Sequence, residues 1–311
     1  VENIETKQLA ALKAESNFVE GGSVLKIEVD ILARLTGKKH VTQLFHAGKK
    51  VKYQYMVMSL LGESLNTLLK RCNKTVTAST QLRIGLHVLH GLKQVHDIGF
   101  VHRDMKPANL AFITKNDNGE TIMRKPRRRA LFRGTTRYCS VSTHEKADQG
   151  RCDDLWSLLY VLVELRGRLP WSHLKEKKEL MELKRKTTDQ ELLEKNSPQL
   201  MAFANHLRNL DYWTRPDYKL LYHVLMDAMR EGGYRFSDKW DWDSVAKNKG
   251  TTTKSTSIVT PSKLTMKTCD DRSKKDKKEP AVNRSEKTGR EGEDDIPPFN
   301  EDDFTSDPLG F

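Results

Sequence analysis

Cysteine is scarce in this 311-residue chain: there are four, Cys72, Cys139, Cys152 and Cys269, and no Cys-x-x-Cys pair. Disulfide-stabilised domains and zinc sites need closely and regularly spaced cysteines, so the sequence indicates neither. Scattered cysteines are typical of proteins kept in a reducing compartment. The expected location is therefore the cytoplasm.

Long hydrophobic runs are also lacking. The longest, Leu155–Leu165, is too short to cross a bilayer, and no apolar stretch with a basic flank opens the sequence. Hydrophobic residues make up 37% of the chain and charged residues 31%, and the mean hydropathy is −0.68. We therefore expect neither a membrane-spanning nor a secreted protein.

Acidic residues are too few to balance the basic ones. There are 54 Lys and Arg against 42 Asp and Glu, a net charge of +12. The surplus lies in residues 1–250, which carry +14, whereas residues 251–311 carry −2. A basic surface favours an acidic or phosphorylated partner. Nucleic acid is the weaker alternative, because no zinc-finger, RRM or homeodomain pattern accompanies the charge.

The apolar pattern divides the chain into a folded part and a tail. From residue 247 onward large apolar residues are sparse, and such a segment cannot offset its ordering entropy by burial, so residues 247–311 are predicted to be disordered. The part before it has an α+β pattern, with a small β-rich region followed by a larger helical one. The predicted strands are Gln8–Ala14 and Tyr53–Leu60, and the predicted helices are Ser23–Leu35, Ser79–Asp97 and Leu155–Leu165. The last helix is apolar on almost every face, which predicts burial on all sides.

The stretch His102–Asn109, with the sequence HRDMKPAN, follows directly on the predicted helix Ser79–Asp97. It matches the protein-kinase catalytic loop at every specified position. Phosphoryl transfer needs an acceptor for the hydroxyl proton, a positive charge near the migrating group and an oxygen ligand for Mg²⁺. Asp104, Lys106 and Asn109 supply these at suitable spacing. The alternative is a polar loop that only caps a helix, and the length of the motif argues against it.

Four further segments extend this match: Phe132–Tyr138 (FRGTTRY), Gly150–Leu158 (GRCDDLWSL), Leu169–Trp171 (LPW) and Arg215–Tyr218 (RPDY). Together with the catalytic loop they resemble the casein kinase 1 superfamily, most closely its tau-tubulin-kinase-like branch. The resemblance covers about residues 9–246. It implies a bilobal protein-kinase fold that uses ATP and Mg²⁺ to phosphorylate Ser or Thr in proteins. Residues 1–60 then form an incomplete small lobe, 61–246 the large lobe and 247–311 the tail.

The resemblance implies an ATP site in the small lobe. Lys13 resembles the lysine that binds the ATP phosphates, and Glu28 resembles its partner on the following helix. Without that context, a lone Lys and Glu are typical of solvated surface. Met58 resembles the gatekeeper, and Ser59–Leu61 resembles the hinge that binds adenine through backbone groups, with Leu61 at its end.

The resemblance also implies roles in the large lobe. Asp104 resembles the catalytic base, and Thr135 resembles the threonine that contacts it. Lys106 is the implied catalytic lysine, and Asn109 the implied Mg²⁺ ligand. Asp154 resembles the residue that braces the catalytic loop from the buried helix.

The sequence departs from the family pattern where Mg²⁺ is bound. Between Asn109 and Thr135 the only aspartate is Asp117, whereas the family has D-F-G in this region. Asp117–Gly119 has the composition of a tight hairpin turn. Arg124–Pro126 then falls where D-F-G is expected, and it contains no carboxylate to bind Mg²⁺.

A second departure is that no Gly-rich loop precedes Lys13, which a truncated start would explain. Three interpretations stay open. The chain is a Ser/Thr kinase of the superfamily, a pseudokinase that binds acidic or phosphorylated proteins, or an incomplete gene product. A deletion and a true pseudokinase explain the missing D-F-G about equally well.

Five of the six residues in Arg124–Arg129 are basic. By family position, this run together with Arg133 and Arg137 is predicted to bind acidic or phosphorylated protein substrates through charge-assisted hydrogen bonds. The alternative is a nuclear-localisation or nucleic-acid patch, which would add the nucleus to the expected locations. The histidines of the helix Ser79–Asp97 lack carboxylates at metal-ligand spacing and are interpreted as structural.

Overall fold

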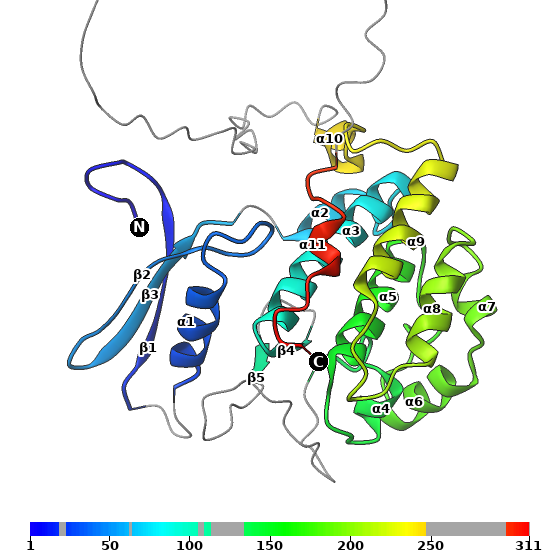
Figure 1. Cartoon of the computed structure of the whole chain (residues 1–311), viewed down its shortest axis with the longest axis horizontal. Helices are drawn as coiled ribbons and strands as arrows, with labels where there is room; N and C mark the ends of the chain where they lie inside the picture. The colour runs from blue at the N-terminus through cyan, green and yellow to red at the C-terminus, as the bar shows by residue number, and fades with distance from the viewer. Residues whose placement is uncertain (19–22, 62–63, 105–108, 113–133, 247–296, 311) are drawn as a thin grey trace, which may run out of the picture.

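The computed structural model of the chain describes residues 1–18, 23–61, 64–104, 109–112, 134–246 and 297–310. Figure 1 shows a small sheet with one helix beside it, joined to a larger part that is mostly helical. This is the two-lobed α+β architecture that the sequence predicts. We call the two parts the small lobe and the large lobe.

The small lobe is a three-stranded antiparallel sheet of order β1-β3-β2, covered by one helix. Its elements are β1 (Ala10–Ser16), α1 (Val24–Arg34), β2 (Leu44–Lys49) and β3 (Tyr53–Ser59). The helix begins after Ser23, whose hydroxyl accepts a backbone hydrogen bond from the first turn. Leu25 and Leu32 of the helix pack on Met56 of β3, so the sheet fixes the position of α1. The limits of β1, α1 and β3 differ from the predicted ones by at most two residues.

The large lobe is built around α3 (Ala78–Asp97) and α5 (Arg151–Arg166). The other helices before residue 247 are α2 (Leu65–Arg71), α4 (Val141–His144), α6 (Lys177–Lys186), α7 (Asp189–Leu193), α8 (Leu200–Arg208), α9 (Tyr218–Glu231) and α10 (Asp241–Ala246). Helix α5 packs against α3, α8 and β4. Leu155, Leu158, Leu159 and Leu162 are fully buried, which confirms the predicted central helix. None of the described helices is both long and apolar enough to cross a membrane.

A short strand pair follows α3 and carries the predicted catalytic loop. Strand β4 (Phe100–Asp104) pairs antiparallel with β5 (Asn109–Phe112). Phe100 and the neighbouring Val95 of α3 pack against Ile31 of α1 and Leu35, which follows α1. This apolar cluster joins the two lobes.

The C-terminal residues 297–310 contradict the prediction of a disordered tail. They contain helix α11 (Asp302–Thr305) and lie against α3 and α9 (Figure 1). Phe299 and Phe304 are only 3% and 1% exposed and belong to the core of the large lobe. The prediction was wrong here because it rested on average composition, whereas two phenylalanines are enough to anchor a short polar segment in an existing core. The rest of the predicted tail, residues 247–296, lies outside the described residues.

Candidate active site

One buried carboxylate, that of Asp154, anchors the backbone at the start of the predicted catalytic loop. Asp154 of α5 accepts hydrogen bonds from the backbone N–H groups of His102 at 2.6 Å and Arg103 at 2.8 Å. Its Oδ2 atom also lies 2.9 Å from Nε2 of His96, and its side chain is 1% exposed. The structure thus places Asp154 where the sequence predicts it, beneath the loop. With three hydrogen-bonding partners, the carboxylate sets the direction in which the chain enters the site.

The Asp104 carboxylate contacts the segment that contains Gly134 and Thr135. Thr135 donates a hydrogen bond from Oγ1 to Oδ1 of Asp104 at 3.1 Å. The preceding Gly134 has a φ of +110°, and a Cβ there would lie 2.9 Å from the carbonyl oxygen of Arg103. Only glycine fits this close approach without strain. The contact between Asp104 and Thr135 is the one that the resemblance implies.

In the small lobe, the predicted phosphate-binding lysine is paired. Lys13 of β1 contacts both carboxylate oxygens of Glu28 of α1, at 2.7 and 2.5 Å. The Glu28 side chain is 16% exposed and that of Lys13 is 48% exposed. The ammonium group is therefore held in place by the helix while it remains open to a ligand.

Comparison with known proteins agrees with this geometry. The protein kinase domain family matches residues 1–225, which is well over half of the chain. The chain belongs to the protein kinase family. Its described relatives are Ser/Thr kinases and include members of the casein kinase 1 group.

Three relatives illustrate the match. A Caenorhabditis elegans protein assigned by its name to the serine/threonine-protein kinases is 43% identical over 265 residues, which cover 78% of this chain and 76% of the relative. A casein kinase I homolog of Encephalitozoon cuniculi is 31% identical, covering 78% and 87%. An inactive tau-tubulin kinase of C. elegans is 30% identical, covering 66% and 81%.

The two predicted adenine-site residues of this kinase differ in exposure. Met58, in β3, is half-buried and packs against the cluster that holds α1 on the sheet. Leu61 follows the end of β3 and is 63% exposed. Their roles in nucleotide binding stay predictions.

The predicted substrate residue Arg137 has partners within the large lobe. Its guanidinium donates to Oε1 of Glu164 at 2.8 Å and to the carbonyl oxygen of Ser172 at 3.2 Å. Its own carbonyl oxygen accepts from the indole N–H of Trp171 at 2.9 Å. Arg137 therefore orders the segment after Thr135, and a substrate role for it stays a prediction. Lys106, Arg133, Asp117 and the run Arg124–Arg129 lie outside the described residues.

Two buried charged residues that hold the segment after Thr135 were missed by sequence reasoning. Lys184 of α6 is 3% exposed and donates to the carbonyl oxygens of Thr136 at 2.9 Å and Cys139 at 2.6 Å. Burial lowers the pKa of Lys184 to about 8. The available signal was its position four residues after the buried Leu180, on the apolar face of α6.

The second missed residue is Asp153, next to Asp154 on α5. Its carboxylate accepts hydrogen bonds from the hydroxyls of Ser140 and Ser142 and from the backbone N–H of Gly150 at 2.7 Å. Burial raises the pKa of Asp153, although these hydrogen bonds oppose the shift. Together with Lys184 it holds residues 136–142, which follow Thr135 in the chain. Asp153 had no separate signal in the sequence, because it belongs to the segment that matches the family.

The described residues fit a nucleotide phosphate better than a metal ion. The Lys13 ammonium is oriented and accessible, as a phosphate ligand requires. For Mg²⁺, the side chain of Asn109 lies outside the described residues, and the sequence has no D-F-G between it and Thr135. Elsewhere in the described ranges no cluster of His, Cys, Asp and Glu could hold a metal ion. The described residues therefore do not complete the set of Mg²⁺ ligands that an active kinase has.

Proposed function

We propose that this protein is a Ser/Thr protein kinase of the casein kinase 1 group, on its tau-tubulin-kinase-like branch. Its reaction would transfer the γ-phosphoryl group of ATP to hydroxyl groups of proteins. The contact between Asp104 and Thr135 at 3.1 Å carries the proposal, because it agrees with the contact that the resemblance implies for the catalytic aspartate. The tau-tubulin-like assignment is supported by the four sequence segments and by the inactive tau-tubulin kinase among the relatives.

In the proposed phosphoryl transfer, each residue of the site has its own role. Asp104 accepts the proton of the substrate hydroxyl, and Lys106 neutralises charge on the migrating group. Lys13, oriented by Glu28, binds the phosphates. Met58 and the backbone through Leu61 contact the adenine. When bound, Mg²⁺ neutralises charge on the β- and γ-phosphates.

The same proposal includes a low activity for the sequence as it stands. Without the D-F-G aspartate, a principal Mg²⁺ ligand is lost. The alignment with the 43% identical C. elegans relative has 265 positions, but it covers only 78% of the 311 residues of this chain. The relative therefore carries residues inside the matched region that this chain lacks. That difference supports an internal deletion. The inactive relative supports the second candidate, a pseudokinase that binds acidic or phosphorylated proteins.

Phosphate transfer from γ-labelled ATP to an acidic, serine-containing peptide tests the proposal. We expect the chain to show weak or no transfer, and a version with a Gly-rich loop and a D-F-G segment restored from an active relative to recover it. Asp104→Asn in the restored version is expected to abolish transfer again, because the proton acceptor is lost while the fold is retained. A restored chain without activity would contradict the kinase assignment and favour the binding module.

The opposite result is equally informative. Mg²⁺-dependent phosphorylation by the unrestored chain, lost on Asp104→Asn, would mean that the missing segment is not needed. A peptide-binding measurement on the same samples separates the two candidates further. A pseudokinase is expected to bind the phosphorylated peptide more tightly than its neutral analogue, with a preference that declines as salt is added, and to transfer nothing.

A further inference from the structure

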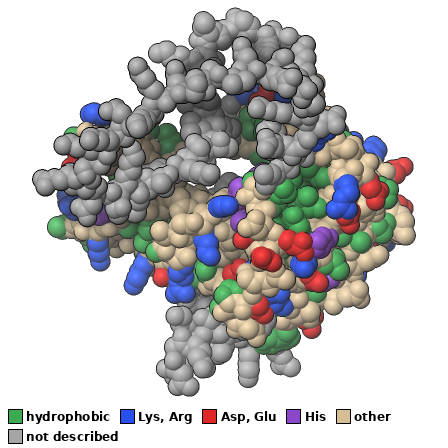
Figure 2. Space-filling model, turned by 45° about the horizontal axis from the view of Figure 1, so that its top comes forward, with side chains coloured by type: hydrophobic (Ala, Val, Ile, Leu, Met, Phe, Trp, Pro, Cys, Tyr) green, Lys and Arg blue, Asp and Glu red, His purple; other side chains and the backbone are tan. Residues whose placement is uncertain are grey.

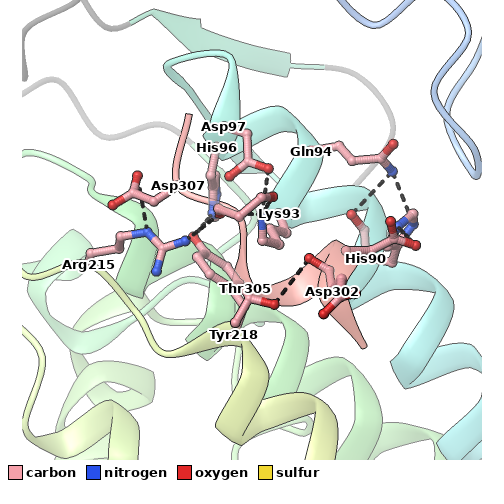
Figure 3. A network of polar contacts seen from close by, with 12 residues as sticks. His90, Lys93, Gln94, His96, Asp97, Arg215, Tyr218, Asp302, Thr305 and Asp307 are labelled. Carbon is pink, nitrogen blue, oxygen red and sulfur yellow. Dashed lines mark hydrogen bonds and ion pairs between the residues drawn. The ribbon is translucent and has the colours of Figure 1, made fainter. Parts of the chain in front are cut away.

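The segment Pro297–Gly310 lies against α3 and α9. We call the surface that it covers, which includes His90, Lys93, Tyr218 and Tyr222, the groove. Figure 1 shows α11 of this segment beside α3, and α11 contacts both α3 and α9. Figure 3 shows Arg215 of the large lobe pointing toward Asp307 of the segment, with Lys93 of α3 nearby. The segment therefore contacts the helical surface through its side chains, as a bound peptide does.

Two aromatic side chains anchor the segment. The ring of Phe299 stacks on His90 with centroids 5.5 Å apart, and the ring of Phe304 stacks on Tyr222 with centroids 4.5 Å apart. Both phenylalanines are almost fully buried. They are five positions apart, and the residues between them face outward or pair with charges. This gives the groove two specific apolar positions.

A buried ammonium group in the groove needs the segment for most of its hydrogen bonds. The Lys93 side chain is 0% exposed and donates from Nζ to Asp97 at 2.6 Å and to the carbonyl and hydroxyl oxygens of Ser306, both at 2.9 Å. Arg215 donates to the same carbonyl oxygen at 2.8 Å and lies 3.5 Å from the Asp307 carboxylate. A charge that is buried without such partners is strongly unfavourable. Any peptide that covers Lys93 must therefore offer an acceptor at this point.

The acidic side chains of the segment face cationic or hydrogen-bonding side chains of the large lobe. Glu301 of the segment pairs with Lys219 at 2.7 Å and with His223 at 3.1 Å, and Asp303 lies 3.5 Å from Nε2 of His90. Figure 2 shows acidic side chains beside basic and histidine side chains on the large lobe, rather than a region of one sign. An acidic peptide is therefore the class of ligand that this groove accepts.

The segment also contacts the small lobe. The loop 36–43 connects α1 to β2, and its His40 ring lies 4.6 Å from that of His87 on α3 and 6.0 Å from that of Phe299. Gln94 of α3 donates to the carbonyl oxygen of Lys39 at 2.7 Å. The Lys39 ammonium reaches the carbonyl oxygen of Pro298 at 3.5 Å. The segment thus covers the place where the small-lobe loop rests on α3.

We propose that the groove between α3 and α9 is a docking site for acidic peptides with two phenylalanines five positions apart. Its resident ligand is the chain's own segment Pro297–Gly310, and occupancy of the site holds the loop 36–43 against α3. Because the loop follows α1 directly, docking stabilises the contact between the two lobes. The proposal concerns binding alone and stands whether or not the protein transfers phosphate.

The test uses the full chain with a protease cleavage sequence inserted between α10 and Pro297. After cleavage, the C-terminal fragment is expected to co-elute with the body in gel filtration and to be displaced by a synthetic peptide of residues 297–311. A peptide with Phe299→Ala and Phe304→Ala is expected to compete roughly 100-fold more weakly, because two anchors are lost. The variants are made in the peptide, so the body of the protein keeps its native sequence.

The matched control is a peptide with Asn300→Ala and Thr305→Ala, which keeps both phenylalanines and all acidic residues. Its affinity should equal that of the native peptide, since both side chains are exposed. Hydrogen exchange of the loop 36–43 should be faster in the intact Phe304→Ala chain than in the native chain. A fragment that elutes apart from the body, or equal competition by both variant peptides, would overturn the docking site. Unchanged exchange in the loop would overturn the link to the small lobe.

Discussion

Asp154 shows how a single side chain organises the site of this kinase. It is buried beneath the loop, accepts two backbone hydrogen bonds and contacts His96. The other ring nitrogen of His96 lies 2.6 Å from the hydroxyl oxygen of Tyr218 on α9. The loop backbone is thus tied through two side chains to a helix on the far side of α3. Such a network is stabilising only while every member has its partners.

Replacing Asp154 by Asn removes this anchor with little change of volume. The amide places a donor where a backbone N–H group now donates, so one buried hydrogen bond is lost and a repulsive contact appears. We expect the free energy of unfolding to fall by about 2–4 kcal/mol. Urea denaturation followed by circular dichroism measures it. The matched control is Asp227→Asn, whose exposed pair with Arg230 is worth less than about 1 kcal/mol. Equal losses in both variants would contradict the anchoring role.

At the scale of elements, the segment Pro297–Gly310 behaves as part of the large lobe. Phe304 packs among buried side chains of α3 and α9 and completes the apolar core there. Its contribution comes from burial of the ring, because the helix α11 is too short to be stable by itself.

Phe304→Ala is therefore expected to lower the free energy of unfolding by about 3–5 kcal/mol, the usual cost of deleting a buried aromatic ring. Thermal and urea unfolding of the full chain would check it. Phe18→Ala serves as the control, since Phe18 is 80% exposed and its loss should change stability by no more than about 0.5 kcal/mol. A loss for Phe304→Ala no larger than that of the control would mean that the segment is not part of the core.

The elements differ in how far the sequence predicts them. Helix α5 was predictable because eleven consecutive residues from Leu155 are mostly apolar, a pattern that only a buried helix satisfies. The pair of Lys13 and Glu28 could be named only through the family resemblance, since neither residue differs from ordinary surface charge. The docked segment could not be predicted from local pattern, because the aromatic partners of Phe299 and Phe304 in the large lobe lie more than sixty positions away. Lys184 was missed although its spacing from Leu180 places it on the apolar face of α6.

At the scale of the whole molecule, a cluster of histidines lies where the two lobes and the C-terminal segment meet. His87 and His90 of α3 face His40 of the small lobe. Burial, with repulsion from the neighbouring rings, lowers the pKa of His87 and of His90 to about 4. The other charged groups around the cluster are Lys39, Arg83, Lys93 and Asp303, and only Asp303 favours the protonated form.

This cluster predicts a loss of stability in mild acid. Below about pH 6.5 the unfolded chain binds protons at His87 and His90, while the folded protein leaves these two rings neutral until about pH 4. The free energy of unfolding should therefore decrease as the pH falls from 6.5 toward 4, by up to about 1.4 kcal/mol per pH unit for each histidine. Urea denaturation at several pH values measures the slope. His87→Phe should make it shallower, and a slope unchanged by that substitution would contradict the assignment.

During translation, the docked segment is made after the two helices to which it binds. The ribosome produces α3 and α9 well before Pro297, and positions 247–296 are translated in between. At roughly 5–20 residues per second, those fifty positions take about 3–10 s. During that time the nascent large lobe exposes an apolar groove, and the Lys93 ammonium lacks its Ser306 partners. Newly made chains therefore pass through a period in which this groove is open to chaperones and to the acidic segments of neighbouring chains.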